Sequence, residues 1–147
     1  MNAIRLVYAQ RTTSARNGYV VQDLEFAVLV KNLAFEKQIA VHWAYDDNLW
    51  QILPADYSCQ SGQGWELWQA RTSCCTLAGH LPGRIRFALQ YLVGGRQYWD
   101  NNQHADYSLA PSAGVLLGPG VKLSHLRYSP LFSRRETGLS VAAAVHR

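Results

Sequence analysis

The sequence predicts an all-β protein whose fold is an antiparallel, immunoglobulin-like β-sandwich. Three observations support this prediction. Apolar and polar residues alternate with a period of two over several segments, as expected for strands with one buried face. The Gly94-Gly95 pair between two apolar runs is typical of a two-residue hairpin turn. No window of about twelve residues has the periodicity of an amphipathic helix.

The expected strands follow one another along the chain. The strand at residues 24–31 has an apolar face made of Leu24, Phe26, Val28 and Val30. The strand at residues 39–45 repeats the pattern with Ile39, Val41, Trp43 and Tyr45, and a third has Ile85, Phe87, Leu89 and Tyr91. Shorter strands are expected at residues 4–8, 65–70 and 105–109. Short strands joined by turns are typical of a sandwich, whose end loops are common ligand sites.

A change in composition after Ala110 predicts a domain boundary. We expect residues 1–110 to form the sandwich and residues 111–147 to form a linker and a basic tail, because Gly, Pro and Ser cluster at 111–120. Two apolar stretches follow, at 121–128 and 139–145, and their layout resembles the start of the chain. Two interpretations stay open. The tail begins a second, similar module, or it is an extension that packs on the one domain.

The excess positive charge lies outside the predicted sandwich. The chain has 14 Lys and Arg against 10 Asp and Glu, a formal net charge of +4. Residues 1–110 are neutral overall, and the surplus lies on five basic residues after Ala110: Lys122, Arg127, Arg134, Arg135 and Arg147. Nucleic-acid-binding domains usually have a basic face on the folded unit, so nucleic acid is not expected as a partner.

Cysteine usage and hydropathy indicate the compartment. Cys59, Cys74 and Cys75 have no spacing typical of a zinc site, and their odd number argues against a disulfide-built secreted scaffold. The N-terminal residues lack the apolar run of a secretory signal, and no stretch approaches membrane-spanning length. We therefore expect a cytoplasmic protein with no membrane partner, no metal and no cofactor.

The stretch at residues 98–107, YWDNNQHADY, is the candidate binding element. Its two aromatics and its run of carboxylates and amides are poor material for a core, and they cannot assemble a nucleophile, a base and an orienting group. They suit a ligand with flat apolar faces ringed by hydroxyl groups, and sugars have that character. The alternative is a polar surface turn beside two core aromatics.

Three blocks in order, with matching spacing, resemble carbohydrate-binding module family 21. The first is VKNLAFEK at residues 30–37, and the second is VHWA at 41–44 followed by DDNLW at 46–50. The third is YWDNN at 98–102, with Asp106-Tyr107 where the family usually has Asn-Tyr. The resemblance covers roughly residues 20–110. It implies a non-catalytic starch- and glycogen-binding β-sandwich, as in fungal glucoamylases and in glycogen-targeting subunits of type-1 protein phosphatase.

The resemblance also implies positions for the binding residues. The principal α-glucan site would consist of Trp50, Trp99, Asn101, Gln103 and Asp106. A second carbohydrate site would fall on Phe35, Lys37 and Trp65, although an ordinary exposed turn aromatic is the alternative for Phe35. Tyr107 is expected in the core, while Asp100 and Asn102 are expected to satisfy backbone amides of the loop.

Two departures from the family pattern affect the principal site. Family members often have an aromatic residue where this chain has Ala88. Asp106 replaces an Asn and loses an amide donor, because an ionised carboxylate only accepts hydrogen bonds. We expect both changes to weaken or retune the site. Modules of this sort bind shallowly, with dissociation constants from about micromolar to millimolar, roughly −4 to −8 kcal/mol.

The alternative function is a glycogen-targeting regulatory subunit that recruits a protein phosphatase. The run from Arg84 to Phe87 (RIRF) matches the short pattern by which such subunits bind the phosphatase. Ile85 and Phe87 fall on the inward face of a predicted strand, so we expect them to be core residues instead.

Enzyme activity is not expected, and no catalytic residue is assigned. The five histidines are scattered, without metal-ligand spacing or a paired carboxylate. The expected partners are an α-glucan polysaccharide or maltooligosaccharide, with a phosphatase or a catalytic domain in trans.

Overall fold

The computed structural model describes residues 2–46, 49–77, 83–111 and 114–122. All regular structure in these ranges is β-strand, as the sequence predicts. The strands are β1 (Ile4–Arg16), β2 (Tyr19–Lys31), β3 (Lys37–Tyr45), β4 (Gln51–Pro54), β5 (Asp56–Gln60), β6 (Trp65–Leu77), β7 (Ile85–Val93), β8 (Arg96–Asp100), β9 (Tyr107–Leu109) and β10 (Val115–Leu117).

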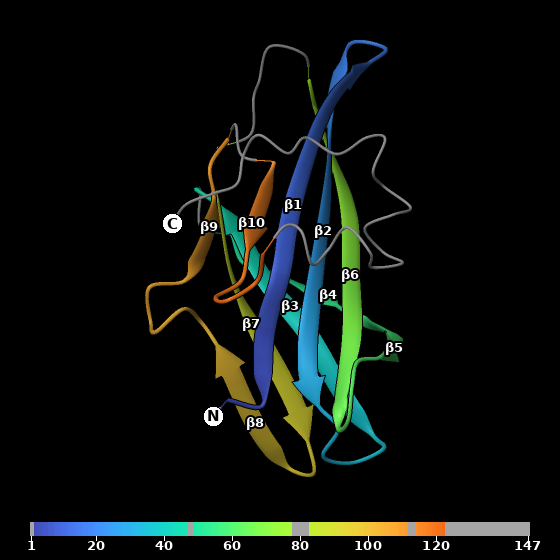
Figure 1. Cartoon of the computed structure of the whole chain (residues 1–147). Helices are drawn as coiled ribbons and strands as arrows, with labels where there is room; N and C mark the ends of the chain where they lie inside the picture. The colour runs from blue at the N-terminus through green and yellow to red at the C-terminus, as the bar shows by residue number, and fades with distance from the viewer. Residues whose placement is uncertain (1, 47–48, 78–82, 112–113, 123–147) are drawn as a thin grey trace.

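The strands form two antiparallel sheets, and the second sheet crosses behind the first in the view of Figure 1. The first sheet has the order β10-β1-β2-β6-β5. The second has the order β4-β3-β7-β8, and β9 also pairs with β7. The predicted Gly94-Gly95 hairpin joins β7 to β8, with φ of 57° and 76° at the two glycines, as a type I′ turn requires. The predicted antiparallel β-sandwich is confirmed.

The core lies between the sheets and is filled by the alternating residues that the sequence predicts. The apolar inward side chains of β2, β3 and β7 that are at most 2% exposed are Leu24, Phe26, Val28, Val30, Ile39, Val41, Trp43, Ile85, Phe87, Leu89 and Tyr91. Phe26 and Phe87 meet across the sandwich, edge to face, with ring centroids 4.9 Å apart. Burial of each large apolar side chain contributes about 1.5–3 kcal/mol. The residues that alternate with them in the second sheet point outward and form its surface.

Some strands differ from the prediction. The sequence predicts ends near Tyr8 and Ala70, whereas β1 and β6 continue to Arg16 and Leu77. Both strands pair with β2 along its whole length, so β2 supplies the backbone partners even where the side chains are polar. β4, β5 and β10 are also not predicted, because strands of three to five residues are too short to show a clear alternation.

The polar half of β1 contains a buried charge. Arg11 is 3% exposed, and its guanidinium donates to Oε1 of Gln22 at 2.7 Å and to the carbonyls of Gly83 and Leu109 at 2.9 and 3.2 Å. Burial lowers the pKa of Arg11 below its ordinary value. Because the bonds to Gly83, before β7, and to Leu109, on β9, reach the second sheet, Arg11 ties the two sheets together at one end of the sandwich.

The segment predicted as a linker contains a strand of the sandwich. β10 pairs with β1, with Leu117 opposite Tyr8, and Val115 and Leu116 are each 2% exposed. Gly118 follows, and a side chain at this position would collide with the carbonyl oxygen of Leu6. The first sheet therefore extends beyond Ala110. Most of the two apolar stretches of the tail, and with them the choice between a second module and an extension, lie outside the described residues.

Tyr91 is expected to make the fold less stable at alkaline pH. Its buried hydroxyl donates to the carbonyl of Lys31 at 2.6 Å, and burial raises the pKa of Tyr91 above its ordinary value of 10.0. Since the pKa is higher in the folded state, the contribution to stability is present below about pH 10 and is lost as the pH rises through the folded pKa. We expect the free energy of unfolding in urea to fall above about pH 10, and to fall less steeply in Tyr91→Phe. Equal slopes for the two proteins would contradict this assignment.

Candidate functional site

The outer face of the second sheet carries the candidate site. His42 on β3 lies opposite Ala88 on β7, and Gln90 on β7 lies opposite Trp99 on β8. Neighbouring residues along these strands fill the core, and successive side chains of a strand point to opposite faces. These four residues therefore belong to one outward-facing surface.

A cavity of about 380 Å³ opens on this face. Residues from β3, β7, β8, the segment before β4 and the loop after β8 line it: His42, Ala88, Trp99, Trp50, Asn101 and Asp106. Trp50 and Trp99 are 43% and 37% exposed, so their rings remain available to a ligand. The cavity combines aromatic surface with an amide and a carboxylate.

Each tryptophan of the cavity has a neighbour that contacts its ring. The imidazole of His42 lies 4.9 Å from the ring of Trp99, centroid to centroid, with an interplanar angle of 57°. The guanidinium carbon of Arg86 lies 5.3 Å from the centroid of the Trp50 ring, within the range of a cation–π interaction. These contacts restrict the two rings before any ligand binds.

The loop after β8 is shaped by residues in the left-handed region. Asn102, Gln103, His104 and Asp106 have φ between 56° and 73°. Asn, Asp and His tolerate this conformation better than most residues, which explains why such a polar run folds here. The loop is closed by hydrogen bonds from the amide of Asp106 to the carbonyl of Asn101 at 2.8 Å and from the amide of His104 to Oδ1 of Asn101 at 3.0 Å.

The residues expected to support the loop do so. Tyr107 is 3% exposed and stacks on Phe87 with ring centroids 5.3 Å apart, which confirms the prediction that it is a core residue. Its hydroxyl donates to Asp100 at 2.8 Å, and Asp100 also accepts from the amides of Leu6 and Asn102, both at 3.3 Å. The side chain of Asn102 donates to the carbonyl of Asp106 at 3.1 Å. Asp100 thus satisfies a backbone amide of the loop, as expected, and one of β1, whereas the side chain of Asn102 satisfies a loop carbonyl rather than an amide.

The structure brings together most residues predicted for the principal site. Trp50, Trp99, Asn101 and Asp106 all line the 380 Å³ cavity. Gln103 is exposed in the turn and does not line it. His42 is a lining residue that the sequence reasoning missed. The signal was present, because the alternation at 39–45 places His42 on the face opposite the core.

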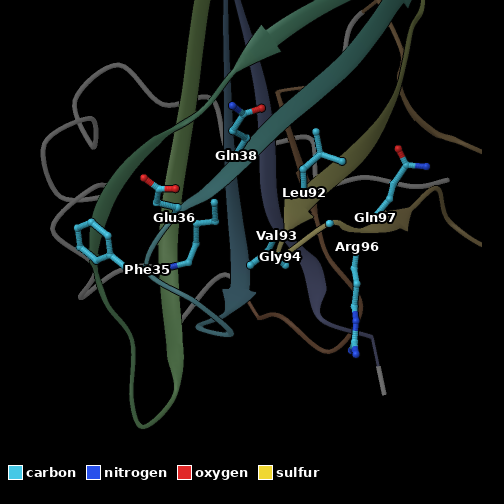
Figure 2. Close-up of a pocket in the computed structure, with 10 residues that line it drawn as sticks. Phe35, Glu36, Gln38, Leu92, Val93, Gly94, Arg96 and Gln97 are labelled. Carbon is cyan, nitrogen blue, oxygen red and sulfur yellow. The ribbon is translucent and has the colours of Figure 1, made fainter.

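A second cavity, of about 840 Å³, lies at the other end of the same face. It is lined by residues 35–38, from the loop before β3 and its first residues, and by residues 92–97 of the β7–β8 hairpin (Figure 2). Phe35 is 95% exposed and lies on the opposite side of this cavity from Arg96 in Figure 2. Gln38 and Gln97 continue the outward-facing rows that contain His42 and Trp99.

The other two residues of the predicted second site have different surroundings. Lys37 lines the second cavity, but its ammonium lies 3.1 Å from Oε1 of Glu66 and 2.8 Å from Oδ1 of Asn32, and its side chain is 4% exposed. Trp65 does not line this cavity. It pairs with Lys31 in the first sheet, with Arg5 5.3 Å from its ring centroid. The structure therefore brings Phe35 and Lys37 to one cavity and Trp65 to another surface.

Two rival readings of the sequence can be compared with the geometry. Ile85 and Phe87 are both 0% exposed, so the prediction that they are core residues is confirmed. Across the described ranges, no group of three or more His, Cys, Asp or Glu residues is placed to hold a metal ion. No helix long and apolar enough to cross a membrane occurs in that part of the chain.

A β-sandwich with tryptophans and polar loop residues around an open cavity has the character of a carbohydrate-binding module. The chain belongs to the carbohydrate/starch-binding module family 21, because the model of that family matches residues 7–110. The match covers most of the described sandwich and includes every residue that lines the two cavities. The family consists of non-catalytic binding modules.

Relatives with known names include two kinds of protein. Glucoamylase 1 of Rhizopus oryzae is 31% identical over 90 residues, which are 58% of this chain and 14% of that protein. Protein phosphatase 1 regulatory subunit 3E of Rattus norvegicus is 35% identical over 85 residues, 54% of this chain and 28% of that protein. The chain thus spans less than a third of the length of these relatives.

Solved structures share the fold. The starch-binding domain of Rhizopus oryzae glucoamylase, in complex with β-cyclodextrin and maltoheptaose, aligns with a TM-score of 0.55 and 24% identity, covering 75% of this chain and 94% of that domain. The carbohydrate-binding module of the muscle glycogen-targeting subunit of protein phosphatase 1 aligns with a TM-score of 0.53 and 21% identity, covering 75% and 76%. These likenesses support the β-sandwich described above.

Proposed function

We propose that this chain is a non-catalytic module that binds α-glucans such as starch and glycogen. The observation that carries the proposal is the convergence of two exposed tryptophans, Trp50 and Trp99, on one polar-lined cavity of a family 21 sandwich. Tryptophan faces pack on the C–H surfaces of glucose rings, while the amide and the carboxylate satisfy hydroxyl groups.

The polar groups of the cavity suit a hydroxylated, uncharged ligand. Oδ1 of Asn101 accepts from the amide of His104, whereas its Nδ2 has no hydrogen-bond partner among the described residues. The carboxylate of Asp106 supplies acceptors on the same cavity wall. The volume of about 380 Å³ is near the lower end of the roughly 300–1,000 Å³ typical of ligand cavities, which suits a short stretch of a glucan chain.

We assign a second, weaker contact with the glucan to Phe35. Its ring is almost fully exposed beside the 840 Å³ cavity, and an exposed aromatic of this kind offers a stacking surface to a sugar ring. The ammonium of Lys37 is engaged by Glu66 and Asn32, so its contribution is to hold the loop that presents Phe35.

Retention on insoluble starch tests the proposal. The wild-type chain is expected to be retained on starch, to be released by soluble maltooligosaccharide, and not to be retained on cellulose, whose β-linked chains differ in shape. Trp50→Ala is expected to lose retention. Equal retention of wild type and Trp50→Ala would refute the site, and release of reducing sugar from the same mixture would show enzymatic activity.

Asp106→Asn is expected to bind maltoheptaose about two- to tenfold more tightly, because the amide adds a donor worth about 0.5–1.5 kcal/mol. Asn accepts the φ of 58° at this position as readily as Asp. Isothermal titration calorimetry measures the change. Asp106→Ala is the control and is expected to bind more weakly than either protein. Unchanged affinity in both variants would show that this side chain does not contact the sugar, and a weaker Asn variant would show that the sugar needs the carboxylate acceptors rather than a donor.

We further propose that the binding module serves a phosphatase or a catalytic domain located elsewhere, since its relatives include a regulatory subunit and a glucoamylase. The run from Arg84 to Phe87 does not support direct phosphatase docking, because Ile85 and Phe87 are buried in the core. Co-precipitation of the chain with the catalytic subunit of protein phosphatase 1, with and without glycogen, separates direct recruitment from sugar binding alone.

A further inference from the structure

His42 occupies an unusual position in the principal cavity. It lines the cavity together with Asp106, its imidazole lies 4.9 Å from the ring of Trp99, and it faces Ala88 across the strand pair. Because Ala88 is small, the imidazole is not covered from β7. A ligand that packs on Trp99 therefore also meets His42.

A chain of hydrogen bonds determines which nitrogen of the His42 imidazole carries a proton. Nε2 of Gln90 donates to Oε1 of Gln97 at 2.9 Å, which leaves Oε1 of Gln90 toward His42. Oε1 of Gln90 lies 2.9 Å from Nε2 of His42 and can only accept, so Nε2 of His42 carries a proton. In the neutral imidazole the other nitrogen, Nδ1, is then an acceptor for a hydroxyl group.

We propose that His42 contacts the glucan and that its neutral form is the one that binds, so that the affinity of the principal cavity falls below neutral pH. The inference rests on the proposed function. Protonation replaces the acceptor at Nδ1 with a donor and adds a charge. An uncharged sugar that displaces water from the cavity then has to desolvate an imidazolium, which is unfavourable.

The charged groups near His42 set the size of this effect. On its own strand Lys37 lies at the first position, Asp46 follows the last, and β4 has no ionisable residue. From β7, Arg86 packs on Trp50, and from β8, Asp100 bonds to Tyr107. Three more titratable residues are close in the chain to the lining residues but do not line the cavity: Arg84 just before β7, Arg96 on β8 and His104 in the loop after β8. The carboxylate of Asp106 does line it and partly compensates a positive imidazole, so Asp106→Asn is expected to steepen the pH dependence.

Calorimetric titration with maltoheptaose at several pH values tests the inference. Wild-type affinity is expected to fall about three- to tenfold between about pH 7.5 and 5.5, the range in which histidine side chains change charge. His42→Gln, which keeps an amide donor for Gln90, is expected to bind with an affinity that is nearly constant over this range. His104→Gln is the matched control, because His104 is exposed on the loop and outside the cavity, and it should retain the wild-type profile.

A second measurement does not depend on any variant. In the wild-type protein at about pH 7.5, addition of maltoheptaose should shift the NMR signals of the His42 ring. Binding that is independent of pH, or a His42→Gln variant that keeps the wild-type profile, would overturn the inference alone. Absence of binding by the wild-type protein at every pH would overturn the proposed function and the inference with it.

Discussion

Replacing Trp99 with alanine is expected to weaken the binding of maltoheptaose by about 30-fold, or about 2 kcal/mol, the loss typical of a tryptophan at the centre of a binding surface. The ring lies in the cavity wall, is 37% exposed, and is held by the imidazole of His42 at 4.9 Å. The substitution removes the stacking surface without disturbing the core, since Trp99 faces outward. Calorimetry gives the affinity, and a thermal melt checks that the fold is intact.

Two further substitutions make this result specific. Phe35→Ala, at the second cavity, is expected to lower the affinity only about threefold, because a single, almost fully exposed ring contributes less than about 1 kcal/mol. Tyr19→Ala, at an aromatic that is 47% exposed in the first sheet, should not change it. If the three variants bound alike, the two cavities would not be the sugar-binding surfaces.

Replacing Phe87 with alanine is expected to lower the free energy of unfolding by about 3–5 kcal/mol, the usual loss for a large aromatic in a core. Phe87 is 0% exposed and lies 4.9 Å from Phe26 and 5.3 Å from Tyr107, centroid to centroid. Since Tyr107 holds Asp100, and Asp100 holds the loop, the variant should also lose glucan binding. Urea denaturation measures the first effect and starch retention the second.

This experiment also decides how the run from Arg84 to Phe87 is used. If Phe87 belonged to a docking motif, Phe87→Ala would abolish phosphatase binding and leave the stability of the module unchanged. If Phe87 is a core residue, the variant loses stability. Arg84→Ala changes the exposed end of the same run and should alter stability by no more than about 0.5 kcal/mol, as is usual at the surface. An equally stable Phe87→Ala variant would argue for docking.

The sequence predicts the parts of the fold in which side-chain pattern and burial coincide. The inward faces of β2, β3 and β7 are visible in the alternation because these strands lie in the interior of their sheets and their inward side chains are buried. The far half of β1 is not visible. Its polar residues are held by pairing with β2 and by the buried Arg11, and neither interaction leaves a periodic signal.

The principal site is predictable for a different reason. Trp50 precedes β4 and Trp99 lies on β8, at opposite edges of the second sheet, and each belongs to one of the blocks that resemble the family. The second site depends on contacts between distant residues. Lys37 meets Glu66, 29 positions away, and Trp65 lies on the other sheet. A resemblance between short blocks carries no information about such pairings.

Both cavities open on one face of the sandwich, and this has a consequence for adhesion. On the proposed function, a granule or a large branched particle that touches this face would engage both cavities at once, and the second contact would form at a high effective concentration. Two weak contacts give avidity on a surface, whereas a short soluble chain fills only one cavity. The module would bind a solid polymer more tightly than a short soluble sugar, from which it would dissociate readily. Its first sheet would face away from the particle.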